Sequence, residues 1–248
     1  MNTIIEFSNV TVSYRENVAL HNVSLKVKEG AFLGVIGPNG SGKTTLLTTV
    51  NGLGKVRSGR VKVFGLELKS HQHYIRKNIG YVPQSSNIDP RLPITVYEVV
   101  KIGRVGKRGM GRRLNHSDYD AIDTALAVVG ITNFKGRPIG HLSSGEKQKV
   151  AIARAIAQQP KIMLFDEPTS NLDPGAQQDI IMLMNSIYRE TGSTIILVTH
   201  ILQHLPESCK EVICLKQGEV IHAGTYNETL DSKLLASLYE CSPEALGS

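Results

Sequence analysis

The sequence has 248 residues, of which 41% are hydrophobic and 20% charged, and this length fits one large α/β domain or one domain with an inserted subdomain. No stretch approaches the ~20 consecutive apolar residues of a transmembrane helix, and the N-terminus lacks a basic segment followed by an apolar core, so we expect a soluble protein without a signal peptide. The formal charge of +6 favours anionic partners such as nucleotides, nucleic acid or acidic lipid, between which charge alone does not choose.

The N-terminal part of the chain is predicted to form strands, then a glycine-rich turn and a helix. Alternating apolar residues predict strands, and a more continuous apolar run predicts a buried strand. The expected strands are Ile4–Phe7, Val23–Val27, Val61–Phe64 and, as the buried one, Ala31–Ile36. The turn from Gly37 to Thr45 opens a helix that extends to about Asn51.

The middle of the chain changes from irregular to helical. Three closely spaced prolines, Pro83, Pro90 and Pro93, predict an irregular segment. From Thr95 to Gln159 apolar residues recur at helical spacing. The residues that carry this spacing are Val96, Val99, Val100, Ala121, Ala125, Leu126 and Val129.

Strands and helices alternate again in the C-terminal part. The expected elements are a strand at Ile162–Phe165, a helix at Pro174–Tyr188, a strand at Thr194–Thr199 and shorter strands at Val212–Leu215 and Glu219–Ile221. Such alternation predicts an α/β fold with a mainly parallel sheet. We expect a single domain over residues 1–248, with an antiparallel β portion at its N-terminus. Residues 1–94 and 160–248 would form the core, and 95–159 an inserted α-helical subdomain.

The glycine-rich turn has the pattern G-x-x-x-x-G-K-[ST], between a strand and a helix. Glycines let successive N–H groups face one anion, and the helix dipole favours a phosphate at the same point. Lys43 adds a cation for the β- and γ-phosphates of ATP, and Thr44 adds a hydroxyl for Mg²⁺. The alternative is a glycine-rich turn that contains these residues by chance. The expected phosphate-binding residues are Gly37, Pro38, Asn39, Gly40, Ser41, Gly42, Lys43, Thr44 and Thr45.

Two adjacent carboxylates end the apolar strand at Ile162–Phe165. Asp166 is placed to hold Mg²⁺ directly or through water, and Glu167 to polarise the attacking water as a general base. The alternative is a strand end whose acids face solvent. Together with the phosphate loop, these residues predict a P-loop NTPase core without defining which kind.

One segment defines the kind of NTPase. Leu142–Glu146, at the start of a helix, resembles the signature Leu-Ser-Gly-Gly-Gln of ATP-binding-cassette (ABC) proteins. Further elements follow in the order of that family, over residues from about 5 to 225. They are an adenine-stacking aromatic (Tyr14), a Q-loop glutamine (Gln84), a D-loop (Ser170–Asp173) and a switch histidine (His200).

The resemblance implies an ATPase with ATP and Mg²⁺ as ligands. Its implied catalytic residues are Glu167, His200, Gln84 and Lys43, and its implied metal ligands are Thr44, Gln84 and Asp166. Two cassettes would close head to tail over ATP, so that signature residues contact the nucleotide of the opposite subunit. These further nucleotide contacts are Ser143, Ser144, Gly145, Glu146 and Asp173.

Each implied contact also has a purely structural interpretation. Ser143 and Glu146 match an S-x-x-E capping box, and Asp173-Pro174 matches an ordinary helix start. Tyr14 could be a half-buried strand tyrosine, and His200 a surface histidine. Gln84 is unremarkable in a proline-flanked loop, so its role rests on the resemblance.

The signature departs from the usual family pattern at two positions. Ser144 replaces a glycine, so the loop must have negative φ there or carry strain. Glu146 replaces a glutamine, so negative charge lies near the expected phosphate unless the side chain stays in the cap. Both changes bear on the strength of the contact between subunits.

A basic segment separates two of the expected helices. Residues 101–113 hold six cations, four glycines and no acid, which predicts a flexible solvated loop. A second interpretation is contact with acidic lipid headgroups. Nucleic acid is disfavoured because the segment has no aromatic residue for base stacking.

The cysteines and the paired histidines carry weaker indications. Cys209, Cys214 and Cys241 are an odd number at non-metal spacings, which indicates a reducing compartment. His71 and His73 have no third ligand nearby in sequence, so we expect no dedicated transition-metal site.

The resemblance is greatest to importer cassettes for iron chelates, haem, cobalamin or oxyanions such as molybdate. It implies a homodimer held at the cytoplasmic face of the cell membrane by integral permease subunits, with an external substrate-binding protein reached through the permease. The alternatives are a soluble ABC ATPase, for example of iron–sulfur cluster assembly, and a small-molecule P-loop kinase. The absence of a segment resembling an acceptor-binding lid argues against the kinase.

Overall fold

The computed structural model describes residues 2–84, 91–109 and 111–240. The chain forms two compact units. The first consists of Met1–Ile75 and Thr194–Ser248, and the second of Arg76–Ser193. Helix α2 (Leu68–Lys77), which was not predicted, contains the boundary between them.

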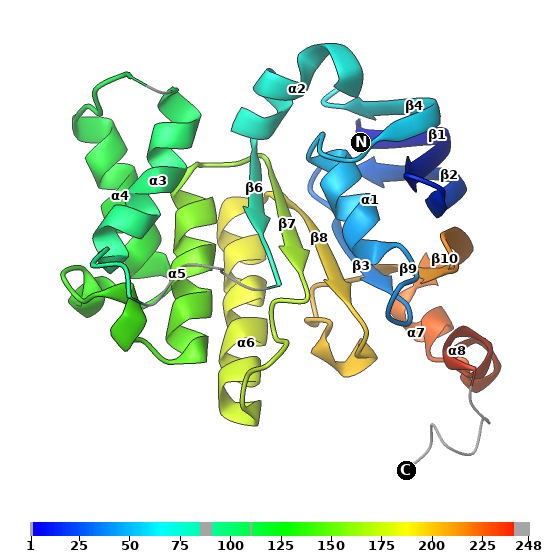
Figure 1. Ribbon diagram of the computed structural model, residues 1–248. Coiled ribbons are helices and arrows are strands. Elements are labelled where there is room, and N and C mark those ends of the chain that lie inside the picture. The colour runs from blue at the N-terminus through cyan, green and yellow to red at the C-terminus, as the bar shows by residue number, and fades with distance from the viewer. Residues whose placement is uncertain (1, 85–90, 110, 241–248) are drawn as a thin grey trace. The chain divides into compact units, whose positions relative to one another are not determined.

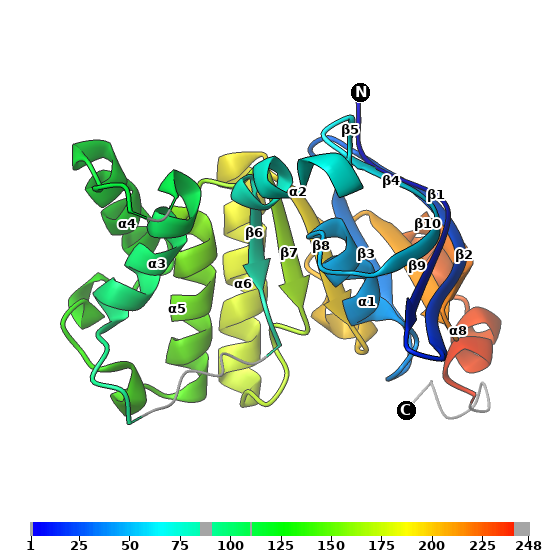
Figure 2. The same cartoon turned by 45° about the horizontal axis from the view of Figure 1, so that its top comes forward.

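The first unit contains an antiparallel sheet in the order β2-β1-β4-β5 (Figure 2). Its strands are β1 (Thr3–Tyr14), β2 (Asn17–Lys28), β4 (Val56–Val63) and β5 (Leu66–Glu67). The three strands predicted for this region lie in β1, β2 and β4, except that β4 ends one residue before the predicted end at Phe64. β1 extends beyond the predicted end at Phe7. A register shift between Phe7 and Val10 changes which face the apolar residues occupy, so the alternation that predicts a strand is interrupted there. The antiparallel N-terminal portion is therefore confirmed.

A second set of strands in this unit is mainly parallel. β3 (Phe32–Ile36) pairs in parallel with β8 (Thr194–Thr199) and with β9 (Glu211–Lys216), and β10 (Glu219–Thr225) pairs antiparallel to β9. Every residue of β3 and β8 is buried, as expected for strands covered on both faces. Helical segments complete the unit: α1 (Lys43–Val50), η3 (Leu202–His204), α7 (Tyr226–Thr229) and α8 (Ser232–Tyr239).

The second unit combines two parallel strands with the predicted helical insertion (Figure 1). Helix α5 packs against α3, α4 and β6, and its apolar side chains fill the space between them. The strands are β6 (Ile79–Val82) and β7 (Ile162–Asp166). The helices are α3 (Val96–Arg108), α4 (His116–Val128), η1 (Thr132–Phe134), η2 (Ile139–His141), α5 (Ser144–Ala157) and α6 (Pro174–Thr191).

The prediction of a flexible basic loop is wrong for residues 101–108, which belong to α3. A capping box between Thr95 and Glu98 starts this helix. Gly103 reflects close packing rather than flexibility, since a Cβ there would collide with the backbone oxygen of Arg154. Only the stretch after Arg108, which contains the exposed Arg112 and Arg113, lies outside the helix.

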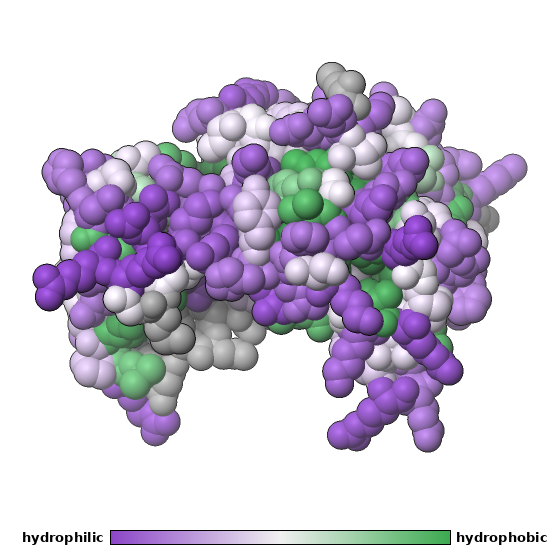
Figure 3. Space-filling model, turned by 90° about the horizontal axis from the view of Figure 1, so that it is seen from above, coloured by the Kyte–Doolittle hydropathy of each residue, from purple (hydrophilic) through white to green (hydrophobic). Residues whose placement is uncertain are grey.

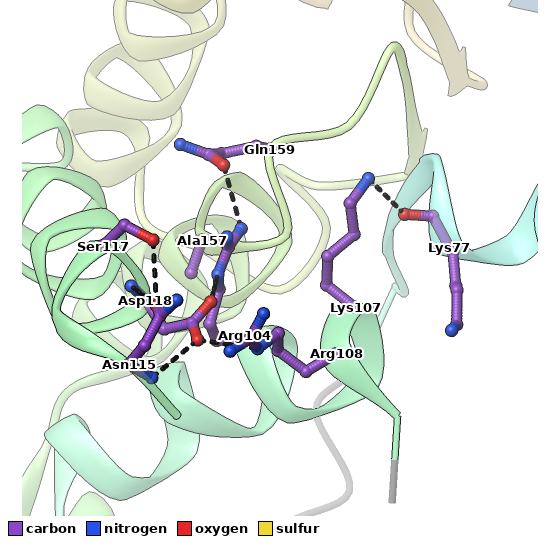
Figure 4. A network of polar contacts seen from close by, with 9 residues as sticks. All are labelled: Lys77, Arg104, Lys107, Arg108, Asn115, Ser117, Asp118, Ala157 and Gln159. Atoms are coloured by element: carbon purple, nitrogen blue, oxygen red, sulfur yellow. Dashed lines mark hydrogen bonds and ion pairs between the residues drawn. The ribbon is translucent and has the colours of Figure 1, made fainter. Parts of the chain in front are cut away.

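The basic residue Arg104 is a buried part of the fold, 9% exposed (Figure 4). Its Nε donates to Asp118 Oδ1 of α4 at 2.6 Å, and its Nη1 donates to Gln159 Oε1 at 2.9 Å. Arg108 Nε lies 2.9 Å from Asp118 Oδ2. Burial opposes the charged acid, but the Asn115 N–H and the two guanidinium groups hold the pKa of Asp118 below its usual range. The network therefore ties α3 to α4 and to the end of α5.

Hydrophilic side chains dominate the face drawn in Figure 3, and hydrophobic ones occupy smaller separate areas. Within the described residues, none of the helices combines the length and the apolar character needed to cross a bilayer.

Candidate functional site

The phosphate loop joins β3 to α1 in the first unit. Two of its glycines are required by close packing: a Cβ on Gly37 would collide with the backbone oxygen of Leu215, and one on Gly42 would lie 2.5 Å from that of Ala19. Gly42, with φ of 102°, is the N-cap of α1 and provides no side-chain cap, and the first turn holds no acidic residue. The positive end of the helix dipole is thus not offset by an acid of that turn, and this suits an anion.

The lysine of the loop is held close to the backbone. Lys43 is only 5% exposed, and its Nζ donates to the carbonyl oxygens of Gly37 at 2.9 Å and Pro38 at 3.0 Å. Thr44, Asn39 and Gly40 are exposed. The Ser41 hydroxyl is buried and has no hydrogen-bond partner among the described residues. A charged ammonium, an exposed hydroxyl and a loop without acids fit a nucleoside triphosphate.

Strand pairing brings the predicted switch histidine to the edge where this loop begins. Ile36, the last residue of β3, is paired with Thr199 of β8. Gly37 and His200 therefore follow their strands at the same carboxyl edge, where ligands of parallel sheets bind. The carbonyl oxygen of His200 accepts a hydrogen bond of 2.9 Å from Tyr239 Oη.

Tyr14 ends β1 in the same unit and is 40% exposed. An exposed ring has a face accessible for stacking. Its contact with adenine stays a prediction.

The second unit holds the two predicted carboxylates. Asp166 ends β7, is 2% exposed, and accepts a hydrogen bond of 3.0 Å from Tyr81 Oη of β6. Burial and the nearby charge of Asp166 raise the pKa of Tyr81, so the phenol stays protonated and remains a donor. Sequence reasoning missed this tyrosine, although it lies in the Tyr-Val-Pro-Gln run that leads to Gln84.

Glu167 and Gln84 were predicted from separate motifs, and the structure brings them together. Gln84 Nε2 donates to Glu167 Oε2 at 3.1 Å. Glu167 is 8% exposed and has a φ of 45°, a left-handed conformation that costs a non-glycine residue about 1 kcal/mol or more. Such strain gathers at functional sites, where surrounding contacts maintain it.

The signature segment has the capped structure that its sequence also allowed. Ser143 accepts from the Glu146 N–H at 3.2 Å, and Glu146 Oε2 accepts from the Ser143 N–H at 2.7 Å. Ser144 is the first residue of α5 and is absent from the residues with positive φ, so the replacement of glycine causes no strain. Glu146 stays in the cap, with Arg137 Nη1 3.7 Å from its carboxylate.

Two further signature and D-loop residues have structural roles. Gly145 is buried, and a Cβ on it would lie 3.0 Å from the Ala176 side chain. Asp173 is the N-cap of α6, accepting from the Ala176 N–H at 3.0 Å. Their contacts with a nucleotide of another subunit stay predictions.

A family model described as ABC transporter matches residues 20–170, more than half of the chain. The zinc uptake system ATP-binding protein ZurA of Listeria innocua is 38% identical over 229 residues, which are 92% of this chain and 88% of that protein. The manganese transport system ATP-binding protein MntB of Bacillus subtilis is 35% identical over 223 residues, 90% of this chain and 87% of that one.

A solved structure, the dimeric post-hydrolysis state of the ATP-binding cassette MJ0796 with ADP and phosphate, is also similar. Its TM-score is 0.78 with 32% identity, and the match covers 90% of this chain and 98% of the other. The fold and the site thus define a P-loop ATPase. The chain belongs to the ABC transporter family, and the prediction of an ATP-hydrolysing cassette is confirmed.

Proposed function

We propose that this protein is the ATPase subunit of a transporter that moves a metal ion or a metal chelate through a separate integral membrane permease. The carrying observation is the pairing of Glu167 with Gln84 beside Asp166, which forms the hydrolytic part of a cassette. The zinc and manganese systems of the two relatives support a metal cargo. These relatives favour a metal chelate over an oxyanion as the cargo. They also favour a transport function over that of a soluble ABC ATPase.

The chemistry follows from the kinds of residue present. The loop residues Gly37–Thr45 bind the phosphates of ATP, with Lys43 as the cation, and Tyr14 stacks on adenine. Glu167 takes up the proton of the attacking water, and Gln84 orients the Glu167 carboxylate and this water. His200 contacts the γ-phosphate. Thr44, Gln84 and Asp166 offer the oxygen ligands that Mg²⁺ prefers, and the bound ion would neutralise charge on the β- and γ-phosphates. The hydroxyl of Tyr81 donates to the Asp166 carboxylate and orients it, without itself binding the metal ion.

The working assembly in this proposal is a head-to-tail homodimer of single-domain subunits. Ser143, Ser144 and Gly145, at the start of α5, contact the γ-phosphate held by the other subunit, while Glu146 caps the helix. Asp173 lies in the adjoining D-loop segment. The dimeric cassette among the similar structures supports this arrangement.

The permease contact is proposed to involve α3. A hollow of 480 Å³ beside this helix is lined by Leu92, Pro93, Ile94, Glu98, Lys101, Ile102 and Val105. Leu92 and Ile102 both line this hollow and are 51% and 52% exposed, and exposed apolar side chains gathered in one patch suit a protein-binding surface. We place the subunit at the cytoplasmic face of the membrane through this contact, with any external binding protein on the opposite side of the permease.

The first experiment tests hydrolysis and dimerisation with Glu167→Gln. Turnover is expected to fall roughly 10²- to 10⁴-fold, the range for loss of a positioned base, while ATP binding remains. The mass of the variant in solution should double on addition of ATP without Mg²⁺. Glu190→Gln, at an exposed position of α6, is the matched control. Near-wild-type turnover in Glu167→Gln would remove Glu167 from the mechanism.

The second experiment tests transport. The cassette is co-purified with its candidate permease and reconstituted into vesicles, and ATP-driven uptake of Zn²⁺, Mn²⁺ and ferric chelates is measured. Ile102→Glu should abolish co-purification and leave the ATPase activity of the isolated cassette unchanged. Failure of all three metals to move, with an intact complex, would reject the metal cargo.

A further inference from the structure

The last turn of α8, near the C-terminus, is anchored to the end of β9. Lys216, the last residue of β9, donates through Nζ to the carbonyl oxygen of Ser237 at 2.6 Å. Its ammonium also lies 3.0 Å from Glu240 Oε1. Leu238, between these two contacts, is fully buried. The position of the intervening residue, Tyr239, is therefore restrained from both sides.

Tyr239 extends from this turn to the residue that follows β8. Its hydroxyl donates to the main-chain carbonyl oxygen of His200 at 2.9 Å, across 39 positions of sequence. The N–H of the same peptide group, which belongs to Ile201, donates to Thr199 Oγ1 at 3.1 Å. The backbone that carries the His200 imidazole is thus restrained on its C-terminal side by a local turn and by one distant side chain.

The same turn of α8 also borders the phosphate loop. A hollow of 240 Å³ is lined by loop residues and by the end of the helix. Its lining includes Pro38, Gly40 and Ser41 of the loop and Lys216, Tyr239 and Glu240 beside them. One short helix therefore lies against the phosphate loop and holds the switch histidine.

We propose that Tyr239 is a positioning residue for ATP hydrolysis, which keeps the backbone of His200 where its imidazole meets the phosphate. The inference rests on the proposed role of His200. The imidazole and the bonded carbonyl belong to one residue, so a displacement of the carbonyl displaces the ring. A misplacement of about 1 Å can lower a catalytic rate as much as ~10²-fold. A purely structural role of Tyr239 would instead affect stability without a specific effect on turnover.

Tyr239→Phe tests the inference, because it removes one hydroxyl and keeps the ring. We expect kcat for ATP hydrolysis to fall about three- to tenfold, the effect of losing one typical hydrogen bond, while KM for ATP stays within about twofold. Tyr226→Phe, at a half-buried tyrosine of α7, should leave both constants unchanged. An unchanged kcat in Tyr239→Phe would overturn the inference.

A double-mutant cycle separates action through His200 from action elsewhere. In His200→Ala, where residual hydrolysis is followed by single-turnover assays with labelled ATP, adding Tyr239→Phe should cause no further loss. An equal fold loss in both backgrounds would show that Tyr239 acts elsewhere and overturn the inference. Wild-type turnover in His200→Ala would instead reject the proposed role of His200 itself.

Lys216→Met provides a second variant that leaves the tyrosine in place. It removes both contacts that anchor the last turn of α8, so kcat should fall in the same direction, again without further loss in His200→Ala. A loss of equal size in the two backgrounds would count against positioning through this helix.

Discussion

Helices α1 and α5 both begin at predicted nucleotide contacts, yet their first turns differ. Gly42 starts α1 in a left-handed conformation, without a side-chain cap and without an acid in the first turn. Ser143 starts α5 with a complete capping box, in which Glu146 accepts a main-chain hydrogen bond. An anion at α1 meets no competing carboxylate of that turn, whereas an anion at α5 approaches a helix start that already has its own acceptors.

This difference indicates a division of labour between the two helix starts. The start of α1, with the buried Lys43 beside it, suits strong binding of phosphate within one subunit. The start of α5 suits a weaker, reversible contact, because its cap stabilises the helix without any ligand. Arg137, 3.7 Å from Glu146, offsets part of the negative charge. Five predictions test this comparison, from the largest expected effect to the smallest.

Lys43→Ala should have the largest effect, because it removes the only cation of the phosphate-loop motif. We expect kcat/KM for ATP to fall about 10²- to 10³-fold, as for loss of one preorganised electrostatic donor. Steady-state ATPase assays measure this, with Lys69→Ala, at an exposed position of α2, as the control. A loss below about tenfold would mean that the α1 dipole and main-chain N–H groups bind phosphate largely by themselves.

Asp118→Asn tests a third helix start, that of α4, where the capping acid also neutralises Arg104 and Arg108. Breaking a buried ion pair leaves an uncompensated charge, so the free energy of unfolding should fall by about 3 kcal/mol. Urea unfolding at pH 7 measures it. Asp120→Asn, at an exposed position of the same helix, should change it by less than about 0.5 kcal/mol.

The pH dependence of the same variant follows from the lowered pKa of Asp118. A depressed folded-state pKa contributes stability that is fully present above the unfolded value, about 4, and is lost as the pH falls through the folded value. The stability difference between wild type and Asp118→Asn should therefore be constant from about pH 5 to 8 and shrink below about pH 4. A difference that grows on acidification would contradict this sign.

Ser143→Ala removes the cap of α5 and should lower the free energy of unfolding by about 1 kcal/mol. Ser186→Ala, at an exposed position within α6, should be neutral or slightly stabilising, because alanine has the higher helix propensity. Urea unfolding compares the two. Equal effects would mean that the capping box contributes little to α5.

Glu146→Gln should have the smallest effect. Glutamine keeps the capping box but removes the negative charge beside the expected phosphate. In the Glu167→Gln background, the dissociation constant of the ATP-bound dimer should fall about two- to fivefold, the scale of one charge at a helix end. Sedimentation at several protein concentrations measures it. A weaker dimer would show that the carboxylate itself contributes to the subunit contact.

Much of the site could be predicted because its residues act within short stretches. The spacing of Gly37, Gly42 and Lys43 needs only a strand before it and a helix after it, and both are present. The capping box at Ser143 needs only four residues. Misprediction occurred where composition was used in place of pattern: cations and glycines in residues 101–108 indicated a loop, although they belong to α3.

The sequence by itself determined the phosphate loop, the helix caps and the order of motifs that marks the family, since each depends on contacts between near neighbours in the chain. Only the tertiary structure decided which distant side chains meet. Tyr81 with Asp166 and Gln84 with Glu167 are more than 80 positions apart, and Tyr239 with His200 is 39 positions apart. Such pairs depend on strand order and helix packing, so no local pattern of residues encodes them.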